Sequence, residues 1–148
     1  MIGLIQRVNW SRVEVDREII GSIEQGITAL IGIEKQDTEA DARRLCERIL
    51  GYRIFSDQDD KMNLCLRDIK GGLLVIPQFT LAADTQKGTR PSFSTAAPPE
   101  IGRKLFDYFY SYCQQQYPIV ETGSFGADMQ VSLCNDGPVT FWLQVNNQ

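Results

Sequence analysis

The chain of 148 residues contains no histidine. Ser-His-Asp and Cys-His catalysis, the HExxH zinc motif and haem ligation by histidine all need an imidazole. These mechanisms are therefore excluded, and any catalysis must use other groups.

Cysteine pairs and long apolar segments are also missing. Four widely spaced cysteines form no CxxC pair, which argues against a zinc knuckle or a thioredoxin-type site and favours a reduced setting: Cys46, Cys65, Cys113 and Cys134. No apolar run reaches the ~18 residues that a membrane helix needs, and the N-terminus is charged too early for a signal peptide. We therefore expect a soluble, cytoplasmic protein without a membrane segment, a bound metal or a cofactor.

Composition and charge indicate one globular domain. A chain of 148 residues, 43% of them hydrophobic, suits a single ordered domain over residues 1–148. Lys and Arg number 15 and Asp and Glu 19, which gives a formal net charge of −4. This charge argues against indiscriminate binding to a polyanion, so a nucleic acid would have to be held by a local basic patch.

The first half of the chain alternates between strand and helix patterns. Alternating apolar and polar positions predict strands at 2–8 and 13–15, then a turn at 17–18, as an antiparallel pair. The almost wholly apolar run 27–33 predicts a central strand. Thr38 and Asp41 resemble a capping box at the start of a helix over 37–51, with Gly51 as its C-cap and one apolar stripe: Ala42, Leu45, Cys46, Ile49 and Leu50.

The second half predicts more strands and another helix. Short strands are expected at 52–55 and 63–66 and a longer one at 73–81. A second helix begins at Pro98-Pro99, and its apolar stripe contains Ile101, Leu105, Phe106, Phe109, Tyr112 and Cys113. Strands at 129–134 and 139–145 are joined by a turn at 135–138. These patterns predict an α+β single domain with a mainly antiparallel or mixed, barrel-like sheet and two principal helices.

Residues 77–81 (PQFTL) carry more polar chemistry than a strand end requires. Because proline lacks an N–H, the strand is expected to bulge, lie at an edge or end at Pro77. Freed backbone N–H groups beside an amide and a hydroxyl could form an oxyanion hole. An ordinary strand terminus accounts for the same residues, so both interpretations stay open.

Two further segments are candidates. In residues 135–140 (NDGPVT), glycine permits unusual backbone angles and the X-Pro bond can be cis, although a plain turn between strands also fits. Residues 84–94 form a polar loop that contains Lys87, Arg90 and Phe93. Its length and its basic and aromatic side chains suit contacts to phosphates and bases.

Together the motifs at 78–81 and 135–140 resemble the two signature motifs of the D-aminoacyl-tRNA deacylases, also called D-tyrosyl-tRNA deacylases. Similar segments follow in order through nearly the whole chain, at 5–8, 45–48, 51–57, 61–64 and 90–94. The resemblance implies a homodimer with its active sites at the interface. It also implies hydrolysis of the ester that links a D-amino acid, or glycine, to the 3′-terminal adenosine of tRNA, with refusal of L-aminoacyl-tRNA.

The resemblance assigns the chemistry to the first motif. The backbone N–H groups of Phe79 and Thr80 would face the developing oxyanion. One such donor typically stabilises the transition state by about 3 kcal/mol. The side chains of Gln78 and Thr80 would help to order the site. The 2′-OH of the terminal adenosine would activate the water, so that no imidazole is needed.

The resemblance assigns selection and binding to other residues. The Gly137-Pro138 pair would have a cis peptide bond and enter the partner's site, where its carbonyls leave no room for an L side chain. Arg7 would buttress this segment, while Phe125 and Met129 would line the adenosine and aminoacyl pocket. A basic patch for tRNA would contain Arg7, Lys87 and Arg90.

One position departs from the family pattern, since this chain has Pro77 where the family usually has serine. A role for that serine cannot be carried over. Two alternatives follow: a nucleic-acid-binding module that kept the fold and lost the chemistry, and a hydrolase with a Thr or Cys nucleophile. The latter is the poorer one because neither Thr80 nor any cysteine has an evident base.

Overall fold

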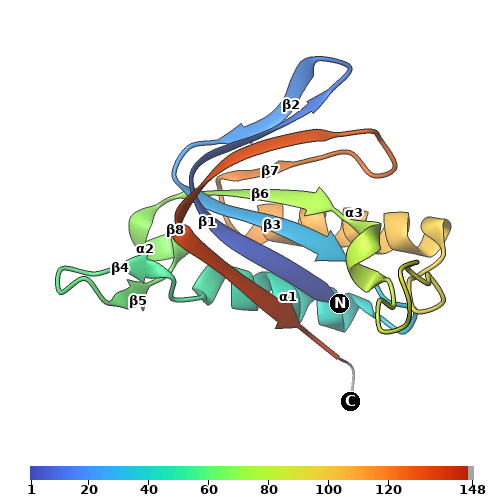
Figure 1. Cartoon of the computed structure of the whole chain (residues 1–148). Helices are drawn as coiled ribbons and strands as arrows, with labels where there is room; N and C mark the ends of the chain where they lie inside the picture. Colours follow the sequence, from blue (N-terminus) through green and yellow to red (C-terminus); the bar gives the residue numbers. More distant parts are fainter. Residues whose placement is uncertain (147–148) are drawn as a thin grey trace.

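The sheet is built around its long N-terminal strand. The computed structural model describes residues 1–146. Its six-stranded mixed sheet has the order β2-β1-β3-β6-β7, with β8 also paired to β1. These strands are β1 (Ile2–Val15), β2 (Glu18–Ile23), β3 (Gly26–Gly32), β6 (Gly72–Pro77), β7 (Val120–Thr122) and β8 (Gln130–Gln144). Figure 1 shows that the sheet is strongly curved.

The predicted N-terminal antiparallel pair is confirmed, but its first strand is continuous. β1 runs through Asn9 and Trp10, which are exposed and therefore break the alternating pattern that the sequence prediction relied on. Trp10 still pairs with Cys134 of β8. The turn to β2 lies at Asp16 and Arg17, with φ of 50° and 67°, one residue earlier than predicted.

The predicted central strand and first helix are confirmed. β3 is buried almost throughout because it pairs with β1 on one side and, in parallel, with β6 on the other. α1 (Glu39–Gly51) begins with the predicted capping box, in which the Thr38 side chain accepts the Asp41 N–H. Its C-cap is Tyr52, so the prediction of Gly51 was wrong by one residue.

The segment after α1 has less strand than predicted. Strands β4 (Phe55–Ser56) and β5 (Met62–Leu64) form a small separate sheet. The predicted strand 63–66 is wrong at its end, where the short helix α2 (Leu66–Ile69) begins. The carboxylate of Asp68 accepts the N–H of Cys65 at 2.8 Å, which favours the helical turn over an extended chain.

The second long helix, α3 (Pro99–Gln116), starts after Pro98 as predicted. Four members of its predicted stripe are buried: Leu105, Phe106, Phe109 and Cys113. Ile101 was predicted incorrectly, because it is 51% exposed in the first turn of the helix. There it lines a groove beside Thr38 and Glu39 instead of entering the core.

Two apolar clusters cover the opposite faces of the sheet. The larger joins α1 and α3 to inward-facing residues of β1 and β3, such as Ile5 and Ile31. The smaller lies on the other face and contains Val8, Leu74 and Ile76. The two helices follow the same face of the sheet (Figure 1). The structure thereby confirms the α+β, single-domain fold with a mixed, barrel-like sheet and two principal helices.

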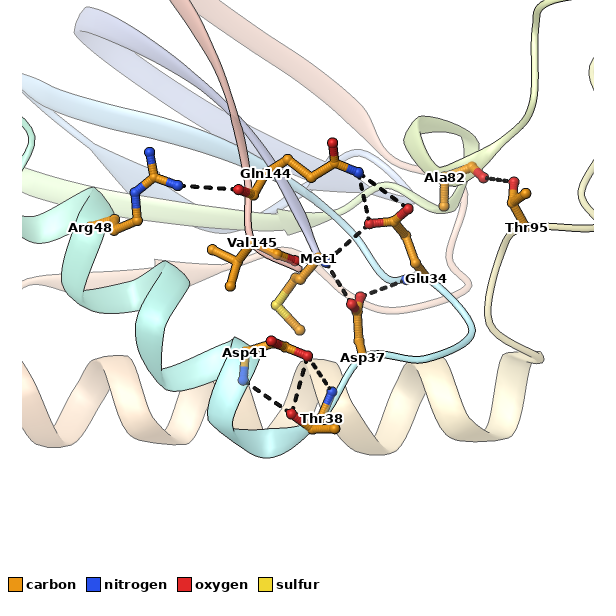
Figure 2. Close-up of polar contacts among 10 residues, drawn as sticks. All are labelled: Met1, Glu34, Asp37, Thr38, Asp41, Arg48, Ala82, Thr95, Gln144 and Val145. Carbon is orange, nitrogen blue, oxygen red and sulfur yellow. Dashed lines mark hydrogen bonds and ion pairs between the residues drawn. The ribbon is translucent and has the colours of Figure 1, made fainter. Parts of the chain in front are cut away.

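The N-terminal amine ties the two ends of the chain to the end of β3 (Figure 2). It is buried, and it donates to Asp37 Oδ1 at 2.6 Å, to Glu34 Oε1 at 3.1 Å and to the Val145 carbonyl at 2.7 Å. Burial raises the pKa of Asp37 even though the ammonium group beside it favours the carboxylate. These contacts fix the turn that connects β3 to α1.

None of the helices within residues 1–146 combines the length and the apolar character needed to cross a membrane.

Candidate active site

The strand β6 ends at Pro77, and the chain then turns into the 3-10 helix η1 (Phe79–Ala82). The predicted strand 73–81 was therefore too long, and of the three expectations for Pro77 the strand end is confirmed. The N–H of Gln78 donates to Ile31 of β3 at 2.8 Å, and its carbonyl accepts from Leu81 at 3.2 Å. Since Leu81 is the first donor inside this turn, the N–H groups of Phe79 and Thr80 are not used by it.

The side chains of this turn face outward. Gln78 Nε2 donates to Thr80 Oγ1 at 2.5 Å, which fixes both side chains. The Phe79 ring is 62% exposed, and its centroid lies 5.3 Å from that of Phe93 in the following loop. An amide, a hydroxyl and two backbone N–H groups are thus presented together at the end of a buried strand, and the two N–H groups are uncommitted because neither has an acceptor within residues 1–146.

A cavity of ≈ 250 Å³ opens beside this turn. Its lining is mainly apolar and comes from β3, η1, the start of α3 and the loop before β8: Ile31, Ile33, Pro77, Gln78, Phe79, Ala97, Pro99, Gly102, Phe125 and Gly126. A cavity with mainly apolar walls and a few polar groups is typical of a small-molecule binding site.

One wall of the cavity is fixed by the end of β3. Ala97 donates its N–H to the Ile33 carbonyl at 3.0 Å, and Lys35 donates to the Thr95 carbonyl at 3.2 Å. The Thr95 hydroxyl donates to the Ala82 carbonyl at 2.6 Å, which joins this segment to η1 (Figure 2). The wall is thus held on one side by β3 and on the other by η1.

Two predicted pocket residues, Phe125 and Met129, occupy different places. Phe125 lines the cavity. The cavity lining does not include Met129, whose sulfur accepts the N–H of Ser124 at 3.3 Å. Met129 therefore holds the backbone of the loop that carries Phe125.

The Gly137-Pro138 segment is a bulge within one strand. The predicted turn between two strands is wrong, because both halves of β8 pair with β1. Gln6 pairs with Thr140 and Val8 with Asn135, so the bulge stands opposite Arg7 alone. The Gly137-Pro138 peptide bond is cis, and both residues are exposed. Pairing on both sides of the bulge fixes where it emerges from the sheet.

Arg7 holds the bulge in place from β1. Its Nε donates to the Asp136 carbonyl at 3.1 Å, and its Nη1 donates to the Ile54 carbonyl at 2.7 Å. Nε also lies 3.4 Å from Asp136 Oδ2. The guanidinium thus joins the bulge to the chain after α1.

Asn135 closes the base of the bulge, and sequence reasoning did not assign it this role. Its Oδ1 accepts the N–H of Val139 at 3.1 Å, and its Nδ2 donates to Thr140 Oγ1 at 3.0 Å. Gln6 Nε2 reaches the same hydroxyl at 3.4 Å. The sequence feature that could have indicated this role is the asparagine at the first position of the 135–140 motif.

Within one chain the bulge and the cavity do not meet. The cavity is lined by Ile31, which pairs with Gly3 of β1, whereas the bulge faces Arg7. Arg7 is four positions after Gly3 along the strand, which is roughly 13 Å at the usual rise per residue. The structure therefore brings Gln78, Phe79, Thr80 and Phe125 together but leaves Gly137 and Pro138 apart from them.

The predicted basic residues Lys87 and Arg90 lie on the loop after η1. Both are exposed. Asp84 and Ser92 close the loop by exchanging backbone hydrogen bonds of 2.7 and 2.9 Å. The loop therefore presents two cations next to the turn that carries Phe79.

Within residues 1–146, no group of Cys, Asp and Glu side chains is arranged to hold a metal ion.

Comparisons with known proteins cover nearly the whole chain. The profile of a family described as D-Tyr-tRNA(Tyr) deacylase matches residues 4–144. A D-aminoacyl-tRNA deacylase of Ralstonia nicotianae is 59% identical over 153 residues, covering 100% of this chain and 92% of that protein. These matches extend over both candidate motifs.

Two solved structures have the same fold. A c-Myc DNA Unwinding Element Binding Protein superposes with a TM-score of 0.95 and is 34% identical, over 99% of this chain and 100% of that one. A probable eukaryotic D-amino acid tRNA deacylase has a TM-score of 0.83 and 15% identity, over 97% of this chain and 98% of that one. The second likeness concerns the fold alone.

Proposed function

The chain belongs to the D-Tyr-tRNA(Tyr) deacylase family, and we propose on this basis that it hydrolyses the ester of D-aminoacyl-tRNA to free D-amino acid and tRNA. It is a hydrolase that acts in proofreading for translation. We propose that residues 1–148 form one deacylase domain. We also propose a cytoplasmic location, because aminoacyl-tRNA is made and used there.

The uncommitted N–H groups of Phe79 and Thr80 carry the proposal for the chemistry. When water attacks the ester carbonyl, the carbonyl electron pair moves to its oxygen, and the two N–H groups donate to that oxyanion. Collapse of this intermediate breaks the bond to the adenosine 3′-oxygen, which leaves with a proton. Gln78 and Thr80, which are hydrogen-bonded to each other, keep the turn in position.

The RNA would supply the group that activates water, because no carboxylate or imidazole is among the residues that line the cavity. With no histidine in the chain, the 2′-OH of the terminal adenosine is proposed to activate the attacking water. The adenine would occupy the apolar cavity beside Phe125, and Lys87 and Arg90 would meet the tRNA backbone. The protein's part is then to orient the ester and to stabilise the oxyanion.

Selection between D- and L-amino acids is proposed to come from a second copy of the chain. The Gly137-Pro138 bulge is exposed, firmly held by Arg7 and Asn135, and separate from its own cavity. In a homodimer it would enter the partner's site, where its main-chain carbonyls oppose the α-carbon and exclude an L side chain. Glycine has no side chain to exclude, so glycyl-tRNA would also be hydrolysed.

Incubation with D-Tyr-tRNA tests the activity. We expect release of free D-tyrosine and intact tRNA well above the spontaneous rate, and no release would contradict the proposal. A matched substrate that ends in 2′-deoxyadenosine tests the role of the RNA hydroxyl. Undiminished hydrolysis of this substrate would show that the hydroxyl is not needed.

A nucleic-acid-binding module without chemistry is the second candidate. One observation favours it: the 34% identical structure is described as a DNA Unwinding Element Binding Protein. The sequence resemblance adds that Pro77 stands where a serine is expected. Tight binding of tRNA or DNA, with no hydrolysis of any D-aminoacyl-tRNA, would support this function instead.

A further inference from the structure

Arg103, on the second turn of α3, contacts a wall of the cavity in two ways. Its guanidinium carbon lies 5.0 Å from the centroid of the Phe125 ring, which is within cation–π distance. Its Nη2 also donates to the Phe125 carbonyl at 3.3 Å. One side chain thus fixes both the ring and the backbone of a residue that lines the cavity.

Two glycines make this arrangement possible. A Cβ at Gly102, on α3, would lie 3.3 Å from Phe125 Cζ, so the bare helix backbone lets the ring approach closely. Gly126 has a φ of +78°, and a Cβ there would lie 3.4 Å from Arg103 Nη2. Phe106 supports the ring from the core, at 6.5 Å between centroids. The ring is therefore held against α3 with the guanidinium over it.

Arg103 forms no close ion pair within residues 1–146. In the part of the chain that the structure describes, no carboxylate lies within 4.0 Å of its guanidinium, and the side chain is exposed. Arginine has five N–H donors in a planar fork that matches a phosphate, and only one of them is directed at Phe125. The guanidinium contacts Phe125, which lines the cavity that, on the proposed function, takes the last nucleoside of tRNA.

We propose that Arg103 is a substrate-binding residue of this site, which contacts the phosphodiester that precedes the terminal adenosine and also holds Phe125 in the cavity wall. The inference rests on the proposed function and extends it. Lys87 and Arg90 belong to the loop after η1, whereas Arg103 belongs to α3, so cations from two separate elements would meet the end of the RNA. The net charge of −4 makes such local cations necessary.

Steady-state deacylation of D-Tyr-tRNA at several salt concentrations tests this role in Arg103→Gln and Arg103→Lys. We expect Arg103→Gln to raise KM about tenfold at low salt, with kcat within about twofold, because one charged hydrogen bond to the substrate is lost. The plot of log kcat/KM against log salt should become less steep by about 0.7, the slope of one phosphate contact to a single strand. Arg103→Lys should restore that slope but not the full KM, since lysine keeps the charge and loses the planar stack.

Lys104→Gln is the matched control, because Lys104 is exposed on the same helix but lines the groove beside Tyr108 and not the cavity. It should change neither KM nor the salt slope. If Arg103→Gln behaves like this control, or lowers kcat alone, the inference is overturned. Should Arg103→Gln fold poorly, KM of Arg103→Lys decides: a KM above that of Lys104→Gln supports the inference, and an equal KM overturns it.

Direct binding of uncharged tRNA separates this inference from the proposed function. If the native protein does not hydrolyse D-Tyr-tRNA, the deacylase activity fails, yet a weaker salt dependence of tRNA binding in Arg103→Gln would still support the phosphate contact. If hydrolysis is normal and the salt dependence of Arg103→Gln is unchanged, only the role of Arg103 fails.

Discussion

Replacing Arg7 by methionine removes the side chain that holds the Gly137-Pro138 bulge while keeping a stem of similar length. Two hydrogen bonds from a charged donor are lost, to Ile54 at 2.7 Å and to Asp136 at 3.1 Å. Such bonds contribute about 1.5–3 kcal/mol each. Ile54 is 1% exposed, so water replaces its lost donor poorly, whereas Asp136 is 42% exposed and its ion pair adds little.

The expected loss for Arg7→Met is therefore about 3 kcal/mol in the free energy of unfolding, or roughly 6–12 °C in Tm for a domain of this size. Urea unfolding measures it. Because the bulge is released, the preference for D- over L-Tyr-tRNA should also fall by about tenfold or more, since displacement of about 1 Å can cost a hundredfold.

Arg12→Met is the matched control, because Arg12 lies on the same strand but makes only surface contacts: an ion pair with Glu14 at 3.1 Å and a cation–π contact at 5.5 Å from the centroid of the Trp10 ring. It should cost less than about 1 kcal/mol and leave the D/L preference unchanged. The reasoning is refuted if the two variants lose equal stability, or if Arg7→Met keeps the full preference.

Three further predictions concern other parts of the chain. Thr38→Ala removes the capping box of α1 and should lower the free energy of unfolding by about 1 kcal/mol in urea; an unchanged midpoint would contradict this. The backbone N–H of Lys61 and then the Asn63 side chain lower the pKa of Asp57 below its ordinary value of 3.8. The contribution of the Asp57 carboxylate to stability is therefore complete above that value and is lost as the pH falls below it. The difference in unfolding free energy between the native protein and Asp57→Asn should shrink in acid, and a difference that is constant with pH would contradict this. In Gly137→Ala the new Cβ would lie 2.7 Å from Val139 Cγ2 at a φ of +134°, so the bulge must shift, and the D/L preference should drop about tenfold or more in the deacylation assay; an unchanged preference would contradict this.

The sequence predicted local features well and long-range pairing less well. The capping box at Thr38 depends on neighbouring residues and is confirmed. Of the three alternatives for Pro77, the strand end is confirmed, although the strand predicted over 73–81 was too long. Two predictions were wrong for the same reason: the division of β1 near Trp10 and the turn at 135–138. β1 and β8 pair along almost their whole length, and this pairing keeps exposed residues in strand conformation.

In the candidate site, too, local features could be predicted from the sequence and long-range contacts could not. The resemblance drew attention to residues 78–80, but the uncommitted N–H groups depend on the turn that η1 makes after Gln78. The contacts of Arg7 with Ile54 and of Arg103 with Phe125 join residues that are far apart in the chain. Local sequence patterns do not contain such contacts, which arise only when the elements pack.

The ratio of kcat/KM for D-Tyr-tRNA to that for L-Tyr-tRNA tests the central claim most directly. Both substrates carry the same side chain and the same RNA, so the ratio isolates the configuration at the α-carbon. The account predicts rapid hydrolysis of D-Tyr-tRNA, with L-Tyr-tRNA no faster than its spontaneous rate. Equal hydrolysis of both substrates, or of neither, would contradict it.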